Sequence, residues 1–306
     1  MSEFKYLFSP LKIGSTVVPN RINFAAHMTN YAVDNLISDR HIHYYRERAK
    51  GGVGLITTEE LGVHPTDHPY DKLVDVYEPE VIPGFQRLTR TIHEYDTRIF
   101  AQLNHNGMQG DGKISRLPVW GPSTGKDPIF RETCKAMELE DIAECVDYYA
   151  ICAQHAVEGG FDGIELQLGH SSLIRQFISP LTNQRQDDYG GSLENRCRFA
   201  LEVIAAVRKA VGPDFTLGVR LNADEMHPKG GLTHEAAKQA AVRLEASGQL
   251  DFLDLSIGTF YNLFLVEGSM HTPLAYTVPL SAGMRSVVKL PVFCTNRIND
   301  PHLAEK

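Results

Sequence analysis

Polar side chains that could do redox or acid–base chemistry follow several short apolar runs in this sequence of 306 residues. They include histidines, carboxylates, amides and arginines, and each comes close to the end of an apolar run. The set is His27, Met28, Glu59, Glu60, Gln102, Asn104, His105, Gln167, His170, Arg220, Asp224, Glu225, Tyr261, Asn296 and Arg297. Any one of them alone fits an ordinary hydrogen-bonded loop residue. Their recurrence after successive runs predicts one shared site.

The apolar runs that must position these side chains are rich in β-branched and aromatic residues, which is typical of buried strands. The runs are Ile22–Ala26, Val53–Thr57, Ile99–Leu103, Gly163–Leu168, Thr216–Leu221, Phe252–Ile257 and Pro291–Thr295. Amphipathic stretches separate them. In one stretch a single helical face is formed by Leu139, Ile142, Val146, Tyr149, Ala153 and Val157. Strands that alternate with helices predict a parallel sheet.

A closed barrel and a doubly wound sheet both fit this alternation. The barrel is favoured because no apolar run is followed by the GxGxxG pattern of a dinucleotide-binding fold. The Leu11–Val18 stretch, with Gly14 at its centre, predicts a hairpin that plugs the bottom of the barrel. We therefore expect an α/β protein of the (β/α)8 TIM-barrel class with an N-terminal β-hairpin. In such barrels the chemistry lies at the carboxyl ends of the strands.

The sequence supplies one strand fewer than this barrel needs. Seven runs are present, whereas the closed fold takes eight strands. The final residues, 299–306, look like the opening of the seventh helix. We therefore expect residues 1–306 to be a single barrel domain that stops before its eighth strand, with two apolar sheet edges left open.

The composition narrows the classes of partner. The sequence is 42% hydrophobic and 22% charged with a net charge of −8, which is typical of a globular protein and argues against a nucleic-acid binder. No apolar run is long enough to span a membrane, and we see no secretory signal, so we expect a cytoplasmic protein. The five cysteines form no CxxC pair, and no metal site is expected among these residues. The expected partner is a small-molecule substrate. The sequence leaves open whether the protein forms a homo-oligomer.

Two chemistries compete for a polar barrel rim. A metal-dependent hydrolase needs an HxH pair on a strand, but His41-Ile42-His43 falls in the predicted helix Asp39–Lys50, where residues two apart do not share a face. The other chemistry is redox work by a cofactor, in which the protein supplies hydrogen bonds and one cation to a flavin ring. The sequence favours the second.

Three runs of the chain carry a resemblance to a known family. Pro19–Ile22, Asn183–Arg196 and Thr295–Pro301 together resemble the old yellow enzyme family. The second run contains a Gly190-Gly191 turn followed by Ser192, which we expect to cap a helix. The resemblance covers essentially the whole chain and is closest to the branch with 2,4-dienoyl-CoA reductase and trimethylamine dehydrogenase. It implies FMN as cofactor and NADH or NADPH as reductant. In that branch a 4Fe-4S motif follows the barrel, in residues that this sequence does not contain.

The resemblance also implies roles on the flavin side. Ala26, His27 and Met28 match the backbone segment that lies against the flavin ring near N5, and Gln102 matches a glutamine that bonds the pyrimidine edge. Arg220 matches an arginine beside N1 and O2, where a cation would stabilise the anionic reduced ring. The alternative for Arg220 is a buried ion pair with a neighbouring acid. The remaining cofactor-binding residues, in the phosphate-binding turn after the seventh strand, are Asn296 and Arg297.

The substrate side departs from the family pattern. A histidine pair, or a histidine and an asparagine, usually follows the fourth strand, with a tyrosine two residues later. Here Gln167 replaces the first histidine, His170 remains, and Ser172 replaces the tyrosine; Phe260 stands where the dienoyl-CoA reductases have a histidine. We expect Gln167 and His170 to bind a polar group of the substrate. The candidates for the proton donor are Tyr261, Tyr31, His105 and a water molecule, although His105 could equally be a packing residue.

The resemblance implies an FMN-dependent NAD(P)H oxidoreductase that passes a hydride to a small organic acceptor such as an activated alkene. One alternative is an amine dehydrogenase of the same branch. Some of these attach the flavin through a cysteine near the end of the first strand, but Ala26–Met28 contains none, so no covalent flavin is expected. Another alternative is a flavin-binding module that transfers electrons without turning over a substrate.

Overall fold

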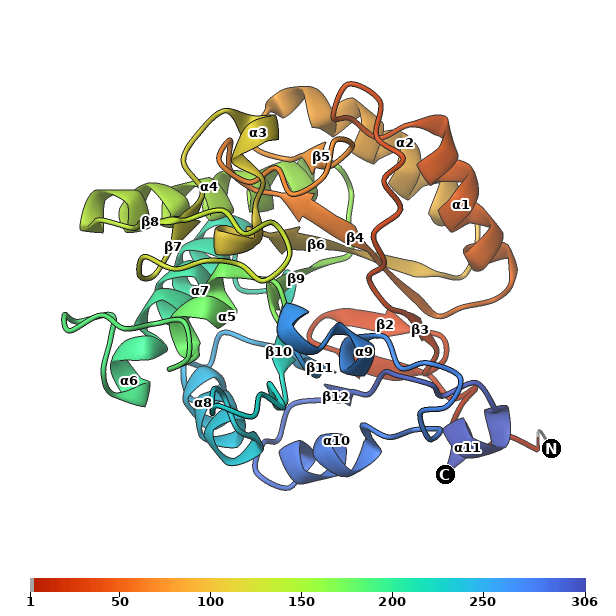
Figure 1. Ribbon diagram of the computed structural model, residues 1–306. Helices are drawn as coiled ribbons and strands as arrows, with labels where there is room; N and C mark the ends of the chain where they lie inside the picture. The colour runs from red at the N-terminus through yellow and green to blue at the C-terminus, as the bar shows by residue number, and fades with distance from the viewer. Residues whose placement is uncertain (1–2) are drawn as a thin grey trace.

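A parallel sheet curls through the molecule with helices packed on its outer side (Figure 1). The computed structural model describes residues 3–306, so the first two residues of the predicted domain lie outside the described residues. The order across the sheet is β12-β11-β10-β9-β6-β4-β3. These strands are β3 (Asn23–Phe24), β4 (Leu55–Gly62), β6 (Arg98–Asn104), β9 (Gly163–Leu168), β10 (Thr216–Asn222), β11 (Phe252–Ser256) and β12 (Val292–Phe293), with β5 (Val74–Asp75) beside the end of β4. Each predicted strand overlaps one of these seven, which confirms the fold class.

Helices follow the strands in the predicted alternation. The longer ones are α1 (Asp39–Lys50), α2 (Ile82–Ile92), α4 (Leu139–Glu158), α7 (Arg198–Val211), α8 (His234–Ala246) and α10 (Val278–Arg285). Shorter elements are α3 (Gly112–Ser115), α5 (Leu173–Ile178), α6 (Leu193–Arg196), α9 (Leu263–Val266), α11 (Pro301–Glu305), the turns η1 (Pro79–Val81), η2 (Gly107–Gln109) and η3 (Phe260–Asn262), and strands β7 (Trp120–Gly121) and β8 (Lys135–Ala136). The predicted cap is confirmed, because the Ser192 hydroxyl accepts a hydrogen bond from the Asn195 N–H.

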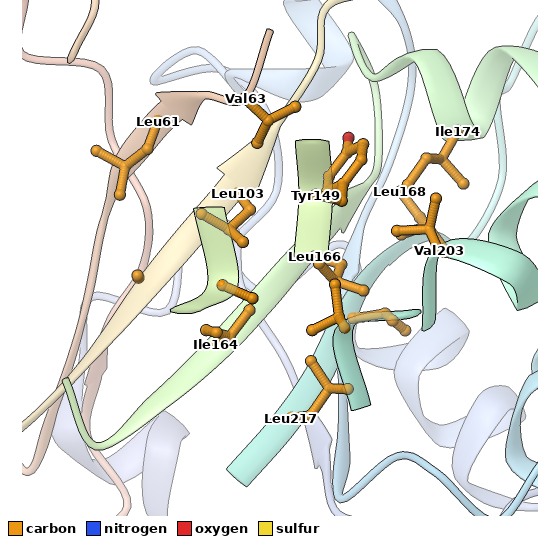
Figure 2. Close-up of a cluster of buried hydrophobic side chains, with 14 of the residues drawn as sticks. Leu61, Val63, Leu103, Tyr149, Ile164, Leu166, Leu168, Ile174, Val203 and Leu217 are labelled. Atoms are coloured by element: carbon orange, nitrogen blue, oxygen red, sulfur yellow. The ribbon is translucent and has the colours of Figure 1, made fainter. Parts of the chain in front are cut away.

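The main hydrophobic core lies between the outer face of the sheet and the helices (Figure 2). Alternate residues of the strands point outward, such as Leu103, Leu166 and Leu217, and they pack with Tyr149 of α4 and Val203 of α7. This arrangement explains why the helices are amphipathic.

The predicted stripe on α4 was wrong at both ends. Leu139 is 58% exposed and Val157 is 38% exposed. The buried face of the helix is instead completed by Cys145, Cys152 and Ala156.

The inner face of the sheet holds a smaller apolar cluster at the end where the strands begin. The hairpin of β1 (Leu11–Ile13) and β2 (Thr16–Val18) inserts Ile13 and Val18 among Leu55, Phe100 and Phe252. The rings of Phe100 and Phe252 lie 5.5 Å apart between centroids. This plug confirms the predicted hairpin, and it leaves the inner positions nearer the carboxyl ends of the strands to polar residues.

The sheet has a gap between its two edge strands. In the described residues β3 pairs only with β4, and β12 pairs only with β11. Between them lies a cavity of about 670 Å³ whose lining includes Leu11, Val18, Asn23, Val292 and Phe293. A strand that closes the barrel would fit at this place. Whether an eighth strand fills it in a longer chain stays a prediction.

Candidate functional site

Beyond the apolar plug, polar residues line the inner face of the barrel. On β6, Phe100 belongs to the plug and Gln102, two residues later, points the same way. Gln102 is in register with Glu165 of β9, and Arg220 of β10 is in register with Asp254 of β11. Four polar side chains from four strands therefore meet inside the barrel.

These four side chains form one network around a single cation. Gln102 Nε2 donates a hydrogen bond to Glu165 Oε1 at 2.7 Å, and Arg220 Nε lies 3.6 Å from Asp254 Oδ2. Burial, together with the charge of Asp254, raises the pKa of Glu165 to about 8. Burial also raises the pKa of Asp254, against the opposing effect of Arg220. The alternative reading of Arg220, a buried ion pair with a neighbouring acid, is therefore present in the structure.

The contact between Arg220 and Asp254 is loose, which leaves bonding capacity in the network. Buried atoms without a hydrogen-bond partner include Arg220 Nε, Glu165 Oε2 and both carboxylate oxygens of Asp254. A fixed cation with unfilled donor capacity, next to an amide that faces the same interior, suits the polar edge of a flavin ring. The chemistry of these residues therefore fits FMN.

The substrate-side pair lies beside the same arginine. Gln167 is in register with Arg220, and its Oε1 accepts the Gly169 N–H at 2.9 Å, which fixes the orientation of its amide. The Nδ1 atom of His170 is buried without a partner. Burial, and then the charges of Arg220 and Arg175, lower the pKa of His170 to about 3. His170 is therefore neutral near pH 7 and can act as a hydrogen-bond donor to a polar substrate group.

Ser172, at the position of the family tyrosine, has a structural task. Its side chain is fully buried, and its hydroxyl accepts the Arg175 N–H at 3.1 Å as the N-cap of α5. A serine hydroxyl is a poor proton donor, because its acidity is far below that of a phenol.

The other candidate proton donors lie in different surroundings. Tyr261 is 44% exposed, and its hydroxyl lies 3.4 Å from the Lys126 carbonyl. His105 is completely buried, its Nδ1 accepts the Gly107 N–H at 2.9 Å, and its Nε2 lies 3.0 Å from Thr66 Oγ1. Both ring nitrogens of His105 are thus engaged within the protein, while the hydroxyl of Tyr261 is more accessible.

The segment Ala26–Met28 lies in the loop after β3, and an anchor just beyond it holds it in place. The Thr29 N–H donates to Glu59 Oε2 at 2.5 Å, and Glu59 Oε1 lies 2.6 Å from His41 Nε2. His41 Nδ1 in turn accepts the Ser38 N–H at 3.0 Å, so the proton of this ring lies on Nε2. Helix α1, through His41, therefore fixes the loop that is expected to lie against the flavin.

The turn after β12 is shaped by two residues with left-handed backbone conformations. Asn296 has a φ of 74° and Arg297 a φ of 55°. The Asn296 amide donates to the Val266 carbonyl at 2.8 Å and to the Tyr276 hydroxyl at 2.7 Å, and Arg297 bonds the Ser269 carbonyl. Both residues also line the cavity between β3 and β12. The structure thus places them together, at the open side of the barrel, and their phosphate-binding role stays a prediction.

Sequence reasoning missed Glu165 and Asp254 as members of the site. It considered the residues at the end of each strand, whereas these two acids lie inside the apolar runs. An acid flanked by apolar residues within a buried strand was the signal that could have revealed them.

A comparison with known protein families matches residues 6–306 to the "NADH:flavin oxidoreductase / NADH oxidase family". Among curated relatives, an N,N-dimethylglycine/sarcosine dehydrogenase from Chromohalobacter salexigens is 38% identical over 99% of this chain and 44% of its own length. The chain thus spans less than half of this relative. No helix among the described residues is long and apolar enough to cross a membrane.

Solved structures also resemble this chain along almost its whole length. A 2-naphthoyl-CoA reductase matches with a TM-score of 0.92 and 29% identity, over 99% of this chain and 48% of the other. An old yellow enzyme homologue from Zymomonas mobilis matches with a TM-score of 0.82 and 27% identity, over 98% of this chain and 84% of the other. The resemblance to the old yellow enzymes is thereby confirmed.

Proposed function

Because the chain belongs to the NADH:flavin oxidoreductase / NADH oxidase family, we propose that it forms the FMN-binding barrel of an oxidoreductase that moves a hydride between NADH or NADPH and a small organic molecule. The observation that carries the proposal is Arg220, a buried cation held loosely by Asp254, in register with Gln167 and near enough to His170 to lower its pKa. Since the chain spans less than half of the curated relative, the activity of the whole protein is part of the proposal.

The residues of this chain would hold FMN along the inner face of the barrel. Bound FMN supplies a two-electron carrier that accepts and returns a hydride. Gln102 would bond the pyrimidine edge, and Arg220 would stabilise the negative charge of the reduced ring. Ala26, His27 and Met28 would lie against the ring, and Asn296 and Arg297 would contribute to phosphate binding.

On the substrate side, we propose that His170 and Gln167 hold an oxygen of an acceptor such as an activated alkene. A neutral imidazole can donate a hydrogen bond without carrying a charge, and this bond strengthens as negative charge grows on the oxygen. Reduction of the alkene also needs a proton at the second carbon. Tyr261 and the half-buried Tyr31 are the candidate donors among the side chains that are not fully buried, and a phenol is a far stronger acid than the hydroxyl of Ser172.

A second candidate function is the oxidation of an amine, and the position of Ser172 favours it. Alkene reduction consumes a proton from a donor, whereas an amine that gives up a hydride becomes an iminium ion and needs no proton. The loss of both of the usual donors of the dienoyl-CoA reductases, at Ser172 and Phe260, therefore does not hinder the oxidation of an amine. The relative named N,N-dimethylglycine/sarcosine dehydrogenase supports this direction.

A substrate panel separates the two reactions. The full-length protein is mixed anaerobically with an electron-poor alkene after reduction, and in its oxidised form with secondary and tertiary methylamines. If the alkene reoxidises the reduced flavin and no amine bleaches the oxidised flavin, the protein is a reductase. If an amine bleaches the oxidised flavin and the alkene does not reoxidise the reduced flavin, it is a dehydrogenase. A protein whose flavin responds to neither class, while still responding to NAD(P)H, would act as an electron-transfer module.

A further inference from the structure

Glu60 is an inward-facing carboxylate whose orientation depends on an irregularity in β4. The register between β4 and β6 shifts between Thr57 and Glu60, which pairs Glu60 with Gln102. Residues in register on neighbouring parallel strands face the same side of the sheet, so Glu60 faces the barrel interior with Gln102. Glu59, one residue earlier, faces α1 instead. Glu60 therefore lies beside the residue expected to bind the pyrimidine edge of the flavin.

Several acceptor oxygens without donors gather around this carboxylate. Asn104 Nδ2 donates to Glu60 Oε2 at 2.7 Å, and Asn106 Nδ2 lies 3.4 Å from Glu60 Oε1. The Asn106 N–H donates to Asp67 Oδ1 at 2.9 Å. These bonds leave Asn104 Oδ1, Asn106 Oδ1 and Asp67 Oδ2 buried with no partner. The cluster of Glu60, Asp67, Asn104 and Asn106 thus has unfilled acceptor capacity, which suits a ligand that donates hydrogen bonds.

The same cluster contains two acids and no base. The neighbouring charges that act most strongly on the pKa values of Glu60 and Asp67 are those of other acids, and the interactions that lower these values most are the hydrogen bonds from Asn104 and Asn106. Two other buried acids of this molecule do have a basic partner: Glu225 lies 2.7 Å from Arg175, and Glu59 lies 2.6 Å from His41. Glu60 is only 9% exposed, and burial raises its pKa to about 7. A buried acid without a cation is unfavourable, so a cationic ligand would stabilise this site.

We propose that Glu60, supported by Asn104, binds the ammonium group of a cationic amine substrate and thereby selects amines over neutral molecules of the same shape. The inference rests on the proposed function and deepens it, because it names the substrate class for the same site. Glu60 is a specificity-determining residue, and the hydride still leaves the carbon next to the nitrogen. Hydride loss can give the iminium ion only from the free amine, so the ammonium group must first lose its proton, and the carboxylate of Glu60 that holds the group would accept it.

The test measures binding with a pair of probes that differ only in charge. N,N-dimethylaminoethanol is protonated near neutral pH, and 3-methylbutan-1-ol is its neutral carbon analogue. The full-length FMN-bound protein is titrated with each probe, and the dissociation constant is read from the change in flavin absorption. We expect the native protein to prefer the cation, and Glu60→Gln to weaken cation binding by about tenfold or more while the alcohol is unaffected.

Glu140→Gln is the matched control, because it removes the same charge from an exposed position on α4. Thermal unfolding of each variant checks that the fold is intact. A native protein without preference for the cation, or a preference that survives in Glu60→Gln, overturns the inference. Absence of FMN, or failure of NAD(P)H to bleach it, would instead overturn the proposed function, so the two failures are distinguishable.

Discussion

At the scale of single residues, His170 shows how the barrel interior sets the state of a side chain. Burial and the charges of two arginines lower its pKa to about 3, so the ring is neutral near pH 7. We expect His170→Ala to lower turnover of an electron-poor alkene by about 10²–10³-fold, as the loss of a donor to a developing oxyanion does, without loss of FMN.

The control for this variant is His43→Ala, which changes an exposed histidine of α1. Steady-state kinetics and the flavin absorbance of the purified variants are compared. Unchanged kinetics in His170→Ala would remove its role in substrate binding. In the native protein, no inflection of the rate profile between about pH 5 and 8 should belong to His170, because its titration is complete below that range.

The raised pKa of Glu165 leads to a prediction about how the stability of the protein depends on pH. Its pKa is raised to about 8 in the folded protein, against an ordinary value of 4.5 when the chain is unfolded. The folded state therefore binds more protons between these values, and the contribution of Glu165 to stability is present below pH 4.5 and is lost as the pH rises to about 8. Glu165→Gln should therefore reduce the loss of stability between these two pH values. Thermal unfolding of flavin-free protein across the range measures it, and parallel curves for native and variant protein would contradict the assignment.

Residue positions were predictable where chemistry coincides with the end of a strand. Gln102, Gln167 and Arg220 were identified in this way, and the structure brings them to one inner face. Glu165 and Asp254 were not, because an apolar run by itself indicates an apolar environment. Only the register of the strands shows that these two acids share the interior with Arg220.

At the scale of elements, the loop after β3 depends on a contact from α1. His41 donates to Glu59, whose other oxygen holds the Thr29 N–H. His41→Ala would leave a buried carboxylate with one donor fewer, and we expect a loss of about 1.5–3 kcal/mol in the free energy of unfolding, together with weaker FMN binding. Denaturant titration and flavin release measure both effects.

Here too His43→Ala is the matched control, since it lies on the same helix with an exposed side chain. Equal stability of the two variants would show that His41 does not anchor the loop, as would FMN binding in His41→Ala as tight as in the native protein.

Strands and helices were predicted well where one pattern of apolar residues ran through the element, and less well where the two faces of an element meet different surroundings. Strand β4 was expected to end at Thr57 but continues to Gly62. The polar run Thr57–Glu60 looks like a loop in sequence, yet all four residues are buried because one face meets the polar interior and the other meets α1. The exposed ends of the α4 stripe, Leu139 and Val157, show that a helical pattern does not reveal how far the neighbouring elements extend.

At the scale of the whole molecule, the open side of the sheet distinguishes this chain from a closed barrel. The two edges and the cavity of about 670 Å³ between them expose apolar residues. We expect residues 1–306 alone to bind a hydrophobic dye and to self-associate through these edges, and a longer chain that contributes a strand there to do neither. Dye fluorescence and light scattering compare the two; equal dye binding and equal scattering would show that the gap is not filled in this way.

The central claim is that this barrel binds FMN and exchanges a hydride with a nicotinamide cofactor. The most direct test is to purify the full-length protein, confirm bound FMN, and add NADH or NADPH without oxygen while following the flavin band at about 450 nm. We predict that the band bleaches with one of the two nicotinamides and returns when an acceptor is added. A protein that retains no FMN, or whose band is unchanged by both nicotinamides, would contradict this claim.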